Sequence, residues 1–139
     1  RADSSVHWDH LLSRGWRIPA IAVDDVHSDN SLRMGWTMIK AESLTLDAIM
    51  AALRAGAFYA STGPEFTDMR VEGDSVVVEC TPVQKIQFYA PAPNGSQILA
   101  STEPLTKGVF TMKRKLAYVR ATITDANGKE AWSPVLYFD

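Results

Sequence analysis

The sequence predicts an α+β protein in which an α/β segment is followed by an antiparallel β-sandwich. Strand and helix patterns alternate through residues 1–65, whereas residues 66–139 follow the two-residue period of strands separated by turns. A hydrophobic content of 46% in 139 residues is sufficient for a globular core. We therefore expect two domains, 1–65 and 66–139.

Two helices are expected before residue 65. The first spans residues 5–14, where apolar side chains share one face and Gly15 provides a C-terminal stop. The second follows Thr45, which can cap it, and carries an apolar stripe at i, i+3, i+4 and i+7 over residues 46–53. Short strands are expected at 18–23, 35–41 and 58–60. This alternation favours a covered parallel sheet of the α/β type.

The second part is expected to contain six or seven short antiparallel strands. Clear alternation or turn signals mark residues 66–71, 76–80, 85–89, 109–113, 118–124 and 131–138. Pro134 should confine the last of these to an edge or a bulge. The single cysteine, Cys80, falls on an alternating run and is expected in the core, so no internal disulfide can form.

The strongest chemical signal follows the apolar run at residues 20–23. Asp24, Asp25 and His27 come directly after it, and Asp25 and His27 are two apart, so on an extended backbone their side chains point the same way. A carboxylate and an imidazole suit zinc, manganese or iron. The alternative is that the two aspartates cap a turn and His27 is exposed on it.

Several pieces in order resemble the C-terminal end of a PHP domain, the polymerase and histidinol phosphatase family of metal-dependent phosphoesterases, in its carbaryl-hydrolase-like branch. The resemblance covers residues 8–64, somewhat under half of the chain. The pieces are Trp8-Asp9, Leu11 to Gly15, Ala22 to His27, Gly35-Trp36-Thr37, Ala52 to Gly56 and Phe58 to Pro64. It implies that the first part belongs to an incomplete α/β barrel.

The resemblance also implies the chemistry. Its Asp-x-His motif corresponds to Asp25 and His27, which would bind neighbouring ions of a cluster of two or three Zn, Mn or Fe ions. Asp24 and Ser28 would support the metals or line the cleft. The other ligands of the family, a His-x-His pair, a glutamate and further histidines, have no counterpart here. The parent would hydrolyse a small phosphoester or ester with metal-activated water. This chain alone would bind metal weakly or not at all and be inactive, and no catalytic or substrate-binding residue is assigned.

The partners follow from the same reasoning. We expect a missing N-terminal barrel portion before Arg1 and, without it, self-association through uncovered apolar faces. A net charge of −2 argues against nucleic acid or a membrane surface as a partner, and the compartment stays open. His7 and His10 are expected on the surface, and residues 61–64 in a turn. The competing function is a β-sandwich binding module without catalysis, which a row of exposed aromatic side chains would favour.

Overall fold

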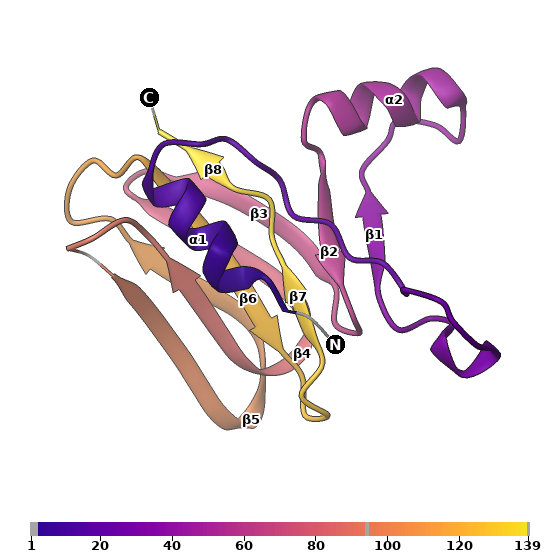
Figure 1. Cartoon of the computed structure of the whole chain (residues 1–139). Helices are drawn as coiled ribbons and strands as arrows, with labels where there is room; N and C mark the ends of the chain where they lie inside the picture. Colours follow the sequence, from indigo (N-terminus) through magenta and orange to yellow (C-terminus); the bar gives the residue numbers. More distant parts are fainter. Residues whose placement is uncertain (1–2, 94, 139) are drawn as a thin grey trace.

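The computed structural model describes residues 3–93 and 95–138, so the outer ends of both expected domains lie outside the described residues. It contains two α-helices, a short 3-10 helix and eight strands (Figure 1). The helical elements are α1 (Ser5–Ser13), η1 (Asp29–Ser31) and α2 (Leu46–Arg54). The strands are β1 (Trp36–Ile39), β2 (Phe58–Ser61), β3 (Phe66–Glu72), β4 (Ser75–Tyr89), β5 (Ser96–Thr111), β6 (Tyr118–Thr124), β7 (Glu130–Trp132) and β8 (Leu136–Tyr137).

The eight strands form a single antiparallel sheet that curls into a half-barrel, which confirms the α+β class. The order is β1-β2-β7-β6-β4-β3, with β5 paired to β4 and β8 paired to β6. Every pairing between strands is antiparallel. Figure 1 shows α1 lying over the strands near the C-terminus, and α2 beyond the ends of β1 and β2.

The curl of the sheet comes from β4. Its first half pairs with β3, its second half pairs with β6, and β5 accompanies both halves. The β4–β5 register shifts between Glu79 and Val83 and again between Val83 and Lys85, next to Pro82, which has no N–H to give to a ladder. The two halves can therefore bend toward each other and turn side chains into one shared interior.

The main core fills that interior. Its members are apolar side chains from β4, β5, β6 and β7 and from the loop before β6: Val76, Val78, Cys80, Val83, Ile86, Phe88, Phe110, Leu116, Val119, Ala121, Ile123 and Ala131. The rings of Phe88 and Phe110 stack with centroids 5.6 Å apart. Cys80 is thus a buried core residue, as the alternation predicted.

The expected two-sheet sandwich is replaced by this one bent sheet, because β4 and β5 continue through both halves and join them. The expected strands at 76–80 and 85–89 are the two halves of β4. The strand predicted at 109–113 is the end of β5, whose earlier part is largely exposed and lacks an apolar alternation. The last strand is interrupted around Pro134 into β7 and β8, as the proline suggested.

In the first 65 residues, both helices form where expected, but the sheet is not parallel. Thr45 caps α2, and its side chain accepts the N–H of Ala48. Ile39 and Phe58 pair at the same end of the β1–β2 ladder. The connection that contains α2 therefore turns back like a long hairpin, and β1 and β2 run antiparallel. The parallel arrangement predicted for this pair is wrong.

Residues 18–23, predicted as a strand, are extended but pair with no strand among the described residues. The segment before residue 65 is also poorly covered. Eleven of the fourteen large hydrophobic side chains that are exposed in the described residues lie between Val6 and Met50. Among the described residues, neither helix is long and apolar enough to cross a membrane.

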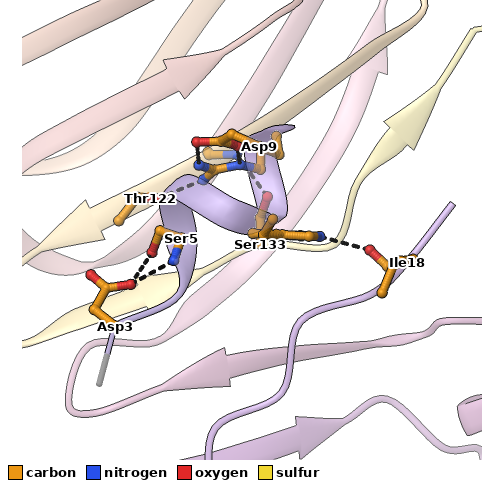
Figure 2. Close-up of polar contacts among 9 residues, drawn as sticks. Asp3, Ser5, Asp9, Ile18, Thr122 and Ser133 are labelled. Carbon is orange, nitrogen blue, oxygen red and sulfur yellow. Dashed lines mark hydrogen bonds and ion pairs between the residues drawn. The ribbon is translucent and has the colours of Figure 1, made fainter. Parts of the chain in front are cut away.

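Arg120, in the middle of β6, attaches α1 to the sheet. Its side chain is fully buried, and it donates two hydrogen bonds to the Asp9 carboxylate of α1, at 2.6 and 2.5 Å, and one to Thr122 (Figure 2). The guanidinium also lies over the rings of Tyr89, at 3.8 Å, and Trp8, at 4.6 Å. Trp8 and Leu12 pack beside it against Tyr118. A bidentate, ring-stacked arginine of this kind fixes both the position and the orientation of the helix.

Replacing Asp9 should cost more stability than replacing Arg120. Asp9→Ala leaves the fully buried guanidinium without its carboxylate and should lower the unfolding free energy by about 3–5 kcal/mol. Arg120→Met leaves a carboxylate whose side chain is 31% exposed and can be hydrated, so a loss of about 1–3 kcal/mol is expected. Urea unfolding followed by circular dichroism measures both.

The control is Arg70→Met on β3. Arg70 pairs with Asp68, Glu72 and Glu79 at the surface, where such pairs contribute about 1 kcal/mol or less. A loss for Arg70→Met as large as that for Asp9→Ala would contradict the special role of the buried pair.

Candidate metal-binding site

The site is built on the extended segment that follows α1. The indole of Trp8 donates its N–H to the Ile18 carbonyl at 2.7 Å, which fixes the start of the segment (Figure 2). Further along, the Thr37 hydroxyl on β1 accepts the Ala22 N–H at 3.3 Å and donates to the Ala22 carbonyl at 3.2 Å. One side chain thus takes the place of a ladder partner, and the segment runs beside β1 without becoming a strand.

The segment then enters a loop whose base is closed by Asp24. Its carboxylate accepts the backbone N–H groups of Arg33, Met34 and Gly35, at 2.9, 2.6 and 2.9 Å. A Cβ at Gly35 would lie 3.0 Å from the Val23 carbonyl oxygen, so a residue without a side chain suits this close approach. Asp24 therefore fixes the base of the loop, and its role beside the metals or in the cleft stays a prediction.

Asp25 and His27 project from this loop. Their side chains are 87% and 80% exposed, and His27 Nδ1 lies 3.8 Å from Asp25 Oδ1. The two groups are near each other, but not through an extended backbone, because Asp25 has a φ of 51° in the left-handed region. At the loop tip, Ser28 contacts the Ser31 hydroxyl at 3.4 Å.

The donor set matches a divalent cation in type. A carboxylate oxygen and an imidazole nitrogen are the ligands that zinc, manganese and iron accept, and no contact among the described residues occupies His27 Nε2. The number of donors is small, however. Within the described part of the chain, no group of three or more His, Cys, Asp or Glu side chains could hold a metal ion. The loop could thus supply two ligands of a larger set.

A groove of about 630 Å³ lies beside the loop, between α1 and the extended segment. Its lining is mainly apolar and also includes acidic, hydroxyl and imidazole side chains. The lining residues include Ser5, His7, Trp8, Leu11, Ile18, Ala20, Ala22, Asp24, Asp25, Gly35, Ala60, Thr62 and Trp132. Asp25 therefore borders both the groove and the solvent-exposed face of the loop.

The other residues considered in the sequence lie where they were expected. His7 and His10 are exposed on α1, and His7 also lines the groove. Ser61 is fully buried, and its hydroxyl donates to the Pro64 carbonyl at 2.7 Å, which stabilises the expected turn. Around Arg120, burial raises the pKa of the Tyr89 phenol, although the positive charge of Arg120 acts in the opposite direction. The Tyr89 phenol, which lies under the guanidinium, therefore stays neutral.

No protein-family model, curated protein or solved structure matches this chain. Sequence reasoning named Asp25 and His27, but it missed Thr37, and it missed the ion pair of Arg120 with Asp9. A signal for the ion pair was the charged residue inside the apolar strand at 118–124, where a buried charge requires a partner.

The Cys80 thiol should be unreactive in the folded protein. Burial raises its pKa to about 11 from an ordinary value of 9.0. The thiolate that attacks alkylating reagents is therefore scarce at pH 8. Because the folded state binds this proton more tightly than the unfolded state, the associated stability is complete below pH 9 and is lost as the pH rises toward 11.

Iodoacetamide labelling at pH 8, followed by mass spectrometry, tests this. We expect labelling only after denaturant is added, with a Cys80→Ala variant as the blank. Rapid labelling of the native protein would show that the thiol is accessible and would contradict its place in the core.

Proposed function

We propose that this chain supplies Asp25 and His27 as two ligands of the metal centre of a PHP-type hydrolase that acts on small phosphoesters or related esters. The observation that carries the proposal is the pair of exposed donors on a loop whose base is fixed by Asp24. When bound, the metal ions would lower the pKa of a bound water and so provide the hydroxide that attacks the ester.

Two ligands do not retain several ions, so the proposal requires further ligands from residues outside these 139. The proposed source is a preceding portion of an α/β barrel. The groove beside Asp25 supports this arrangement, because a small ester could lie between its apolar walls with its reacting group toward the loop. The chain by itself is proposed to bind metal weakly and to lack hydrolytic activity.

Metal binding at the loop is the first test. In wild-type chain, Mn²⁺ should broaden the NMR signals of Asp25 and His27 selectively, because a paramagnetic ion relaxes only nearby nuclei. Asp25→Ala and His27→Ala should each remove the effect. The matched control is Asp29→Ala, which removes an exposed carboxylate from the same loop. Broadening that survives both ligand substitutions, or that centres on Asp29, would overturn the proposal.

The activity test needs the longer protein that the proposal requires. Its coding sequence should contain a His-x-His strand and further His and Glu ligands before residue 1. In that protein, His27→Ala should reduce metal-dependent hydrolysis of bis(4-nitrophenyl) phosphate by more than the roughly 10- to 100-fold that loss of a supporting partner of a ligand costs. Full activity in the variant would exclude His27 from the centre.

The same segment also suggests an interaction surface. Ile21 and Val23 are 66% and 69% exposed on the extended segment. Burial of one such side chain contributes about 1.5–3 kcal/mol. We propose that the barrel portion covers this surface and that isolated chains use it to self-associate. The alternative of a binding module without catalysis has less support, since Trp16 is the single exposed aromatic side chain among the described residues.

Self-association can be followed by sedimentation velocity. The wild-type chain should sediment with a concentration-dependent increase in mass, and Ile21→Lys combined with Val23→Lys should shift it to monomer. Ile98→Lys combined with Val109→Lys on β5 is the control, because it changes exposed apolar residues far along the chain. A wild-type monomer at all concentrations would refute the association.

A further inference from the structure

The turn between β6 and β7 presents an asparagine side chain to solvent (Figure 1). Asn127 is directly followed by Gly128, and both residues are exposed. The backbone N–H of Asn127 donates a hydrogen bond to Asp125, but no hydrogen bond among the described residues engages its side-chain amide. The carbonyl carbon of that side chain is therefore accessible to a nucleophile.

An asparagine that precedes a glycine can react with its own backbone. When the nitrogen of the next residue attacks the side-chain carbonyl carbon, a succinimide ring closes. A glycine after the asparagine favours this closure, because it has no Cβ to crowd the approach. Asn127 and Gly128 provide this pair of groups at an exposed position.

The reaction needs only water as a co-reactant. The Gly128 nitrogen loses its proton to solvent and forms a bond to Cγ of Asn127, while the C–N bond of the side-chain amide breaks and ammonia leaves. Water then adds to one of the two ring carbonyl carbons and opens the ring. One opening gives aspartate. The other gives isoaspartate, in which the main chain runs through the former side chain.

The folded turn restrains the first step. The N–H of Gly128 donates to the backbone carbonyl of Asp125 at 3.1 Å, so the proton that must leave is held in a hydrogen bond. The Asp125 carboxylate also accepts the N–H groups of Asn127 and Lys129, at 2.8 and 2.9 Å. Hydrogen bonds to a charged group are stronger than those between neutral groups. The turn must therefore open against Asp125 before the nitrogen can attack.

The same turn leads directly into the junction between β7 and β2. The Glu130 carbonyl accepts the N–H and the hydroxyl of Thr62, at 2.8 and 3.0 Å, and the Thr62 hydroxyl accepts the Glu130 N–H at 2.9 Å. A Cβ on Gly63 would lie 2.7 Å from the Cβ of Lys129, so this junction leaves little room for a displaced chain. A longer main chain in the turn would displace Lys129 and Glu130 from these contacts.

We propose that Asn127 is a site of spontaneous deamidation, that the Asp125 carboxylate sets its rate, and that conversion to isoaspartate loosens the junction of β7 with β2. Thr62 also lines the groove beside the extended segment, so the modification changes one wall of that groove. The inference goes beyond the proposed function and does not depend on it.

Peptide mass spectrometry after incubation of the folded chain at pH 8 tests the site. Wild type should accumulate isoaspartate at Asn127 but not at Asn30, an exposed asparagine that is followed by Ser31. Asp125→Ala should react roughly tenfold faster, because the two hydrogen bonds to the carboxylate no longer oppose opening. Asp29→Ala removes an exposed carboxylate from another loop and should match wild type.

Hydrogen exchange measures the structural consequence. In the isoaspartate form, the amides of Thr62 and Glu130 should exchange faster than in unmodified chain, whereas those of Val76 and Val78 in the core should not change. Asn127→Asp is the matched control, because it adds the same charge without lengthening the main chain. This variant should keep slow exchange at the junction.

Each part of the proposal has an outcome that overturns it. Absence of isoaspartate at Asn127 in folded wild type, under conditions in which urea-unfolded chain converts fully, overturns the site. An unchanged rate in Asp125→Ala overturns the control by Asp125. If circular dichroism shows that this variant is unfolded, Asp125→Asn takes its place, and its rate should exceed that of wild type. Slow exchange at Thr62 and Glu130 in the isoaspartate form overturns the loosening of the junction.

Discussion

The bend in β4 is the constraint on which the rest of the molecule depends. A straight strand would carry its apolar side chains along one flat face, and half of the core would face water. The register shifts around Val83 and the missing N–H of Pro82 let β4 fold its two halves toward each other. Val76 and Phe88 then share one interior, although they lie at opposite ends of the strand. The curl also leaves β6 with one face to the core and the other available to α1.

That second face explains why a fully buried arginine is found in β6. Arg120 points away from the apolar interior and toward α1, where Asp9 and two aromatic rings surround it. Removing this charge from water carries a large penalty, which two charge-assisted bonds and the ring contacts offset. The arrangement specifies one helix position, whereas apolar contacts alone would allow the helix to slide. Trp8 of the same helix donates its indole N–H to the Ile18 carbonyl, so the start of the extended segment is fixed relative to the helix.

Local signals in the sequence located both helices and most of the strands, but they missed the first part of β5 and the long-range pairing. Helix α2 follows from its Thr45 cap and its period, both encoded within nine neighbouring residues. Residues 18–23 have the composition of a buried strand, yet a strand also needs a neighbouring ladder, and Thr37 provides side-chain bonds in its place. The partners Asp9 and Arg120 are 111 positions apart, and no spacing rule connects them. Likewise, the motif pointed to Asp25 and His27, but it did not indicate that the Asp24 carboxylate accepts three backbone N–H groups.

The loop has a base that is fixed by Asp24, and it exposes the side chains of Asp25 and His27 to solvent. Ligands on a mobile loop lose conformational entropy when they bind an ion, and each ordered backbone residue costs about 1–2 kcal/mol. Under the proposed function, closure of the loop base by Asp24 would accept that loss during folding, so less would remain to be lost when an ion binds. The exposure of Asp25 and His27 would serve the opposite need, because donors that share an ion with further ligands must stay accessible. The high exposure of Asp25 and His27 and the hydrogen bonds that Asp24 accepts are thus two separate features of the loop, and the proposed function would use both.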